Sequence, residues 1–211
     1  ITPGDCVNSY VLVRTWTFID GCGNTSEVSQ TITVEDVTAP VTPTPPADVL
    51  VECDAEVPAP VDLTAVDNCD GDITVSPTES ITPGDCVNSY VLVRTWTFID
   101  GCGNTSEVSQ TITVDDVTAP VTPTPPADVL VECDAEVPAP VDLTAVDNCD
   151  GNITVSPTEV ITPGTCVNSY VLVRTWTFID GCGNTSEVSQ TITVDDVTAP
   201  VAPSAPVDVL V

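Results

Sequence analysis

The chain contains no histidine, no lysine and no methionine, and its only basic side chains are three arginines in 211 residues. Without histidine or lysine, the usual pairings of a nucleophile with a general base are missing, so an enzyme is not expected. The arginines stand against 32 acidic residues, and the net charge of −29 argues against partners such as nucleic acid or an anionic membrane. No apolar run reaches the roughly 18 residues of a membrane span, so direct membrane insertion is not expected either.

Ten cysteines occur at regular intervals, but no two of them form a CxxC pair. Because histidine is also absent, a zinc site is not expected. Evenly placed cysteines in a small acidic module indicate disulfides, and disulfides indicate an oxidising, extracellular compartment. The sequence has neither a signal peptide nor an initiator methionine. We therefore expect an internal segment of a larger secreted or cell-surface protein.

The sequence repeats itself with a period of 80 residues, and the stretches 1–80 and 81–160 differ at only three positions. An enzyme needs one site, whereas interchangeable modules supply length, spacing and multivalency. The repeat therefore predicts a structural module of an extracellular filament or adhesin stalk. Its expected partners are neighbouring identical repeats, associating laterally or end to end. The alternative is an adhesive repeat that presents many copies of one weak carbohydrate site to surface glycans.

The densest proline stretch, TAPVTPTPPADV, occupies residues 38–49 and returns at 118–129. Proline-rich sequence favours an extended, semi-rigid spacer, so we expect module boundaries there. A rival frame cuts before each ITPG sequence and gives modules at 1–80 and 81–160. The proline frame leaves the predicted strands uncut and predicts the C-terminal half of a preceding repeat at 1–38, complete repeats at 39–118 and 119–198, and the start of another at 199–211.

Hydrophobic periodicity predicts an all-β fold. Residues 108–114 alternate apolar and polar side chains, which is the pattern of a half-buried strand, and 90–100 form a long β-branched and aromatic run. Turn-forming Gly, Pro and Asn clusters separate these strands from shorter ones expected at 48–53, 61–67 and 72–79. Several short strands with such turns predict tandem immunoglobulin-like β-sandwich domains.

The order of the strands also predicts disulfides, two in each domain. If 48–53 runs downward, the alternation of strand directions places Cys53 and Cys86 at the bottom of the module and Cys69 and Cys102 at the top. Closing each ~33-residue loop is worth about 3–4 kcal/mol in the chain-entropy model. Cys6 and Cys22 would have partners upstream of the first residue. The predicted pairs are Cys53–Cys86, Cys69–Cys102, Cys133–Cys166 and Cys149–Cys182.

Three motifs resemble those of the HYR-like (hyalin-repeat-like) domains: DNCDG at 67–71, RTWTFIDGCGN at 94–104 and the terminal TITVDD, all of which recur one period later. The resemblance covers the whole chain. It implies an immunoglobulin-like module of the kind found in tandem in large surface and secreted proteins of bacteria, notably adhesins of the Bacteroidetes. It implies no particular ligand.

Acidic residues gather in the turns, and their spacing predicts calcium as a structural cofactor. Asp67, Asp70 and Asp72 surround a glycine turn, a spacing that can wrap several oxygens around the ion. The predicted topology brings this turn close to the 100–104 turn and to the last strand of the preceding module, where the carboxylates would repel each other without a cation. The alternative interpretation is that they are turn-forming residues facing water. The predicted ligands are Glu35, Asp36, Asp67, Asp70, Asp72, Asp100, Asn104, Asp115, Asp116, Asp147, Asp150, Asn152, Asp180 and Asn184.

The remaining residues of interest have structural interpretations. Each arginine stands two residues before a tryptophan, so we expect a stacked or ion-paired arginine beside a core tryptophan. Scarcity of aromatic residues favours the structural module over a carbohydrate-binding repeat. The Thr and Pro of VTPTPP are typical of a mucin-type stalk, which predicts O-linked sugar at Thr42, Thr44, Thr122 and Thr124.

Overall fold

The computed structural model describes residues 1–206, which fall into two units, one from Ile1 to Asp115 and one beginning at Asp116. Nearly all of the regular structure is β, which confirms the predicted class. The unit boundary lies close to the predicted module boundary at 118/119, and the first unit also contains residues 1–38. The last five residues of the repeat expected at 199–211 lie outside the described residues.

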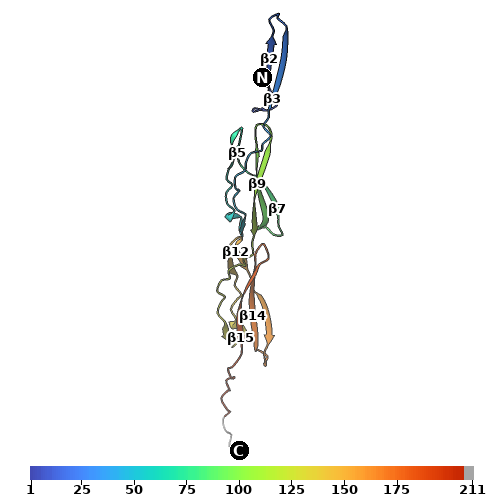
Figure 1. The fold of residues 1–211 in the computed structure, drawn as a ribbon. Coiled ribbons are helices and arrows are strands. Elements are labelled where there is room, and N and C mark those ends of the chain that lie inside the picture. The colour runs from blue at the N-terminus through green and yellow to red at the C-terminus, as the bar shows by residue number, and fades with distance from the viewer. Residues whose placement is uncertain (207–211) are drawn as a thin grey trace, which may run out of the picture. The chain divides into compact units, whose positions relative to one another are not determined.

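The first unit is built around a four-stranded sheet with the order β4-β9-β8-β7 (Figure 1). Strand β8 (Ser89–Ile99) and strand β9 (Thr105–Asp115) form a long antiparallel hairpin, flanked by β7 (Thr78–Pro83) and by β4 (Val49–Val51). Strand β4 pairs with β9 in parallel, whereas the other pairs are antiparallel. These directions agree with the alternation of strand directions predicted from the sequence.

A second layer, the hairpin of β5 (Leu63–Asp67) and β6 (Gly71–Val75), covers the aromatic end of the β8–β9 hairpin. Trp96, Phe98 and Ala65 are fully buried between the two layers, because apolar side chains alternate along both hairpins. A second cluster around Ile112 and Val114 packs against β4. The chain between β4 and β5 includes a 3₁₀ turn, η1 (Asp54–Glu56).

The second unit repeats this arrangement. Its four-stranded sheet has the order β10-β15-β14-β13, and its second layer is the hairpin β11–β12. The same side chains are buried one period later, with Trp176 and Phe178 fully enclosed. Its elements are β10 (Val129–Val131), η2 (Asp134–Glu136), β11 (Leu143–Asp147), β12 (Gly151–Val155), β13 (Thr158–Pro163), β14 (Tyr170–Ile179) and β15 (Thr185–Val194).

The predicted strand at 72–79 is two strands in the structure. Strand β6 ends at Val75 and pairs with β5, whereas β7 begins at Thr78 and pairs with β8 in the other sheet. Ser76 and Pro77 lie between them, and proline cannot donate a hydrogen bond to a ladder. The chain therefore changes layers at this point.

The first 38 residues form β1 (Thr2–Pro3), β2 (Tyr10–Ile19) and β3 (Thr25–Val34). Strands β2 and β3 pair in the same register as β8 and β9, because the sequence is the same. Their aromatic face is nevertheless exposed: Trp16 is 47% exposed and Phe18 59%, whereas Trp96 and Phe98 are fully buried. Burial of this face therefore depends on the second layer and not on the hairpin itself.

The proline-rich stretch packs against the sheet, which corrects the prediction of a spacer. Ser106 donates to the carbonyl of Pro40 (2.7 Å), and Gln110 donates to the carbonyl of Ala47 (2.8 Å). The same bonds recur in the second unit, at Pro120 and Ala127. Proline carbonyls accept hydrogen bonds although proline lacks an N–H, so an extended proline-rich chain can still be held along a strand.

The cysteine pairing differs from the prediction. Cys102 is bonded to Cys6, which lies 96 residues away, instead of to Cys69. Cys69, Cys133 and Cys166 are free thiols, as is Cys22, so the predicted pairs Cys69–Cys102 and Cys133–Cys166 are wrong. The physical reason is that the loop carrying Cys6 lies against the β8–β9 turn, with the two Cα atoms 4.9 Å apart. Four further cysteines are in disulfides: Cys53, Cys86, Cys149 and Cys182.

Among the described residues, no helix has the length and apolar character needed to cross a membrane.

Candidate metal centre

The turn between β5 and β6 is organised by one aspartate. Asp67 accepts hydrogen bonds on Oδ1 from the backbone N–H groups of Cys69 (2.8 Å) and Asp70 (2.9 Å). Gly71 closes the turn with φ of 75°, a conformation that residues with a Cβ rarely adopt. This is the Asx-turn chemistry for which Asp-Asn-Gly clusters are selected, so turn formation accounts for Oδ1. Asp67 does not face water, however, because it is 4% exposed.

The turn between β8 and β9 has the same design. Asp100 accepts on Oδ1 from the N–H groups of Cys102 (2.9 Å) and Asn104 (2.8 Å), and on Oδ2 from the Asn104 side chain (2.7 Å). Burial raises the pKa of Asp100, but the hydrogen bonds from Asn104, Cys102 and Gly103 together lower it below its ordinary value. Asp70 connects the two turns, because its Oδ2 accepts from the N–H of Gly101.

A third carboxylate comes from the segment that follows β3. Asp36 is 7% exposed, and its Oδ1 accepts from the N–H of Thr38 (3.1 Å). Its backbone carbonyl accepts from the Asn104 side chain (3.1 Å), which holds the segment against the β8–β9 turn. Asp36, Asp67 and the Cys69 sulfur provide atoms that all lie within 4.8 Å of one another.

The second unit contains the corresponding carboxylates, in two overlapping clusters. Asp116, Asp150 and Asp180 provide oxygens that lie within 4.8 Å of one another, and so do Asp116, Asp147 and the Cys149 sulfur. Asp150 connects the two turns here as well, through the N–H of Gly181, and Asn184 donates to the carbonyl of Asp116 (3.0 Å). The cluster is therefore a repeated feature of the fold.

Several of these carboxylates have one satisfied oxygen and one without a partner. Oδ2 has no hydrogen-bond partner in Asp36, Asp67, Asp116, Asp147 or Asp180, although each residue is at most 7% exposed. A buried polar atom without a partner costs about 1–3 kcal/mol, and more when it is charged. Turn formation accounts for Oδ1 in these residues but leaves Oδ2 unexplained.

The electrostatics of the second cluster are unfavourable without a cation. Burial, followed by the charges of Asp147, Asp180 and Asp150, raises the pKa of Asp116. In Asp180 burial also raises the pKa, but the hydrogen bonds from Asn184, Cys182 and Gly183 lower it overall. The two groups therefore lie side by side with their pKa values moved apart, and Asp116 is protonated before Asp180 as the pH falls.

Carboxylate and carbonyl oxygens are the ligands that calcium prefers, at 2.3–2.6 Å. The cluster of Asp116, Asp150 and Asp180 consists only of oxygens, and Cys149 beside it is in a disulfide and cannot act as a thiolate. In the first unit the free thiol of Cys69 has its pKa raised by burial and by the Asp36, Asp67 and Asp70 carboxylates, so it is protonated at neutral pH. The donor set fits a hard cation.

Not all predicted ligands lie in these clusters. Glu35 and Asp115 are exposed, and Asp72 and Asn152 are exposed residues of strands β6 and β12. The Asn104 and Asn184 side chains act as hydrogen-bond donors to the carbonyls of Asp36 and Asp116, and so hold the segments after β3 and β9 against the turns that carry the asparagines. The sequence analysis predicted the asparagines as metal ligands and missed their role as hydrogen-bond donors. It also missed that each acidic cluster has a cysteine sulfur beside it, Cys69 in the first unit and Cys149 in the second. Only the tertiary contact between the turns reveals these.

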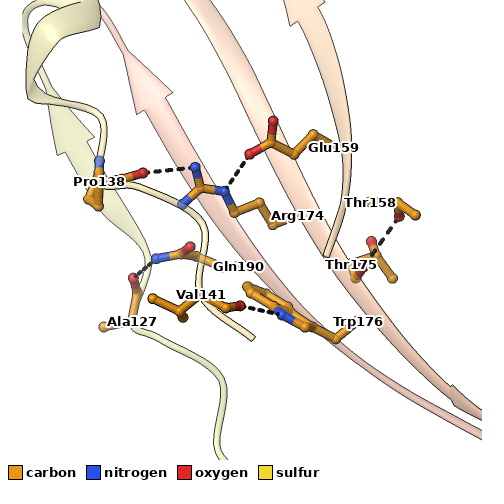
Figure 2. A network of polar contacts seen from close by, with 9 residues as sticks. All are labelled: Ala127, Pro138, Val141, Thr158, Glu159, Arg174, Thr175, Trp176 and Gln190. Carbon is orange, nitrogen blue, oxygen red and sulfur yellow. Dashed lines mark hydrogen bonds and ion pairs between the residues drawn. The ribbon is translucent and has the colours of Figure 1, made fainter. Parts of the chain in front are cut away.

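The polar groups around the tryptophan are structural, as the spacing of Arg and Trp predicts. Figure 2 shows Arg174, which pairs with Glu159 at 2.8 Å and donates to the carbonyl of Pro138 (2.8 Å). Trp176 donates to the carbonyl of Val141 (2.9 Å). Arg94 forms the same ion pair with Glu79 in the first unit. These contacts attach the strand-poor segment between η2 and β11 to the large sheet.

The predicted sugar acceptors divide into two groups. Thr44 and Thr124 are exposed, whereas Thr42 and Thr122 are half-buried in the extended segment along the sheet. Modification needs an exposed hydroxyl, and Thr44 and Thr124 meet this requirement better than Thr42 and Thr122 do.

A family model described as "HYR-like domain with 4 cysteines" matches residues 41–114 and 120–194. A curated protein from Lytechinus variegatus, named "Hyalin", is 32% identical over 213 aligned positions, which cover 94% of this chain. The chain spans 39% of the length of that relative. The two matched segments each contain one four-stranded sheet, one two-stranded layer and one set of acidic turns.

Proposed function

The chain belongs to the family of HYR-like domains with four cysteines, and from that premise we propose that it is a structural repeat of an extracellular fibre or adhesive stalk. The observation that carries the proposal is the repetition itself: the same two-layer core and the same acidic turns occur in both units. Repeated modules supply length and spacing. The disulfides support a secreted or cell-surface location as part of this proposal.

The proposal includes calcium as a structural ion at the acidic turns. The support is the set of buried Oδ2 atoms without partners, together with the raised pKa of Asp116. An ion there would join the segment after β9, which carries Asp116, to the turns that carry Asp150 and Asp180. Binding only to the folded form would stabilise the protein by about 2.7 kcal/mol at a calcium concentration one hundred times Kd.

Carbohydrate binding is the less favoured function. Stacking on a sugar needs exposed aromatic rings, but Trp96, Phe98, Trp176 and Phe178 are fully buried. Trp16 and Phe18 are exposed, but they occupy the positions that the second layer covers in the complete modules. We therefore propose the structural function. A bacterial filament is its specific form, suggested by the resemblance of the motifs, although the curated relative comes from another kind of organism.

Isothermal titration of the chelator-treated protein with calcium tests the ion. We expect saturable binding that competes with a chelator and raises Tm. The Asp72→Asn variant is a matched control, because the second repeat naturally has Asn152 at the same position. It should bind as the unchanged chain does. Absence of calcium binding at millimolar concentration would remove the ion from the proposal but leave the structural module intact.

Antibody labelling of the native material tests the structural module itself. An antibody raised against residues 119–198 should mark extracellular fibres at regular intervals in electron micrographs. Labelling confined to the cell interior, or to single unassembled molecules, would contradict the proposed function.

A further inference from the structure

Three positions distinguish residues 1–80 from 81–160, and one of them changes the chemistry of an exposed strand residue. Asp72 in the first unit corresponds to Asn152 in the second, where strand β12 begins GNIT in place of GDIT. Both side chains are exposed, and neither belongs to the acidic clusters found among the described residues. The calcium proposal therefore does not account for this exchange.

The exchange completes a sequon, the Asn-x-Ser/Thr sequence that accepts N-linked sugar in secreted proteins. Asn152, Ile153 and Thr154 form one in β12, whereas Asp72 interrupts the corresponding sequence in β6. The chain contains three further sequons, each of sequence Asn-Thr-Ser, at 24–26, 104–106 and 184–186. A sequon is short enough to occur by chance, so its structural surroundings decide whether the asparagine can carry a sugar.

The chemistry of the modification sets a simple condition. An N-linked sugar is transferred from a lipid-diphosphate-linked oligosaccharide in the secretory pathway. The bond between sugar C1 and the diphosphate oxygen breaks, a bond from C1 to asparagine Nδ2 forms, and Nδ2 loses one proton. An unmodified Nδ2 has two hydrogens to donate, and a modified one has only one. An asparagine that uses both hydrogens in the fold therefore cannot carry the sugar without losing a bond.

The asparagines of the β8–β9 and β14–β15 turns use both hydrogens. Nδ2 of Asn104 donates to the carbonyl of Asp36 (3.1 Å) and to Asp100 Oδ2 (2.7 Å). Asn184 donates to the corresponding groups of the second unit. Both asparagines are half-buried. A sugar on either would break one of these bonds and occupy the contact between the turn and the segment that the asparagine holds.

Asn152 has the opposite properties. Its side chain is exposed, and no hydrogen bond joins it to any of the described residues. Alternate residues of a strand face opposite sides, so Asn152 and Thr154 share the exposed outer face of β12. Ile153 between them packs against the core that contains Trp176. Both side chains that define the sequon thus face solvent, while the fold is held by the residue between them.

The neighbour of Asn152 across the ladder is apolar. Val146 on β11 lies directly opposite Asn152 and is 56% exposed. Directly opposite side chains share one face of a sheet, with Cβ atoms roughly 4.5–5.5 Å apart. A first sugar ring on Nδ2 would therefore lie against Val146 and cover it. In the first unit the opposite pair is Val66 and Asp72, and there a negative charge keeps the same face polar.

We propose that Asn152 is the N-glycosylation site of the second unit and that its sugar covers the outer face of the β11–β12 layer. The same position then carries a sugar in one module and a negative charge in the other, and either group keeps this face hydrophilic. A bulky sugar also prevents a modified module from associating with another molecule through this face. The inference rests on the proposed secreted location and is independent of calcium.

Secretion of the chain from a eukaryotic host tests the site, because such a host supplies the lipid-linked donor and the transferring enzyme. Every chain carries Ser26→Ala, which removes the sequon at Asn24, where only one hydrogen is used, on Asp20 Oδ2. Mass spectrometry of peptides from the secreted protein, before and after treatment with peptide N-glycosidase, then reads each remaining sequon. The enzyme leaves aspartate wherever a sugar was attached.

We expect a sugar at Asn152 and unmodified Asn104 and Asn184. The matched gain-of-site variant is Asp72→Asn, which completes a sequon in the corresponding strand of the first unit and should add a second sugar. The reverse exchange, Asn152→Asp, should remove the sugar, and so should Thr154→Val, which leaves the asparagine in place. Chains for the calcium measurements are made in a host without this pathway, so that Asp72→Asn carries no sugar there.

Unmodified Asn152 in the secreted parent chain overturns the proposal, and so does a sugar at Asn104 or Asn184 in equal amount. The gain expected from Asp72→Asn keeps the test decisive if a variant that removes the site is poorly secreted, because failure to gain a sugar also counts against the proposal. The outcome is separate from that of the proposed function. An unmodified Asn152 leaves the labelling of fibres unchanged, and a failure of that labelling leaves the mass of the Asn152 peptide unchanged.

Discussion

Replacing Asp116 by asparagine should stabilise the calcium-free protein and remove its response to calcium. Asp116 is 3% exposed, and one of its oxygens lies within 4.8 Å of an oxygen of Asp180, which is also buried. At that distance and an effective dielectric constant of about 20, two negative charges repel by about 3 kcal/mol. Asparagine keeps Oδ1 for the N–H of Thr118, so the turn loses no hydrogen bond. Its amide can also donate to a neighbouring Oδ2.

The exposed Asp150 adds less, because solvent screens its charge. Relaxation of the turn reduces the gain further, so we expect Asp116→Asn to add about 1–3 kcal/mol in chelator. Each kcal/mol shifts Tm by roughly 4–8 °C in a domain of this size. In saturating calcium the sign should reverse, since the variant lacks a charged ligand and forgoes the stabilisation that the ion supplies.

The assay is thermal unfolding followed by circular dichroism, with each protein measured in chelator and in calcium. Asp72→Asn provides the control, because Asp72 is an exposed strand residue outside the clusters. It should change the free energy of unfolding by no more than about 0.5 kcal/mol in both conditions. Destabilisation by Asp116→Asn to the same degree in chelator and calcium would refute the reasoning, because it would make Asp116 a turn residue alone.

Three further predictions concern the core, the pH dependence and the thiols. Trp96→Ala should cost about 3–5 kcal/mol in denaturant unfolding, because Trp96 is fully buried, whereas Trp16→Ala at 47% exposure should cost much less. Equal costs would contradict the burial argument. Because the folded pKa of Asp180 is lowered, its contribution to stability is present above its unfolded pKa and lost as pH falls through the folded value. Asp180→Asn should therefore flatten the acid limb of a Tm–pH profile, and an unchanged limb would show that Asp180 contributes nothing. Maleimide should label Cys69 more slowly than Cys133 at pH 8, because burial and nearby carboxylates raise the pKa of Cys69, and labelling at equal rates would count against this shift.

The alternation of apolar residues was enough to predict the β class, because a strand exposes alternate side chains to opposite faces whatever it packs against. Strand β8 lies within one residue of the range expected at 90–100, whereas β9 begins three residues before the range expected at 108–114 and ends one residue after it. Trp96 is in the core as expected. The Asp-Asn-Gly turns could also be predicted, because the contacts that form them are local in the sequence. Their hydrogen bonds join residues two to four positions apart, as in Asp67 with Cys69.

Which surfaces meet was not contained in any local pattern. The sequence of the β2–β3 hairpin is that of β8–β9, yet Trp16 is exposed and Trp96 is not, because only tertiary packing supplies a second layer. The proline-rich stretch has the composition of a spacer, but side chains from β9 hold it against the sheet.

The same limit explains the cysteines and the acidic cluster. Strand order places Cys102 at one end of its module, but two partners lie at a compatible level, one in the same module and one in the preceding copy. Only the fold decides for Cys6, by bringing the two Cα atoms within 4.9 Å. The sequence likewise identifies the acidic turns, whereas burial of Asp116 beside Asp180 is a property of the packed turns. By itself the sequence determined the strands, the turns and the period, because these depend on neighbours along the chain. Pairing between distant segments depends on which surfaces pack, and the tertiary structure decided that.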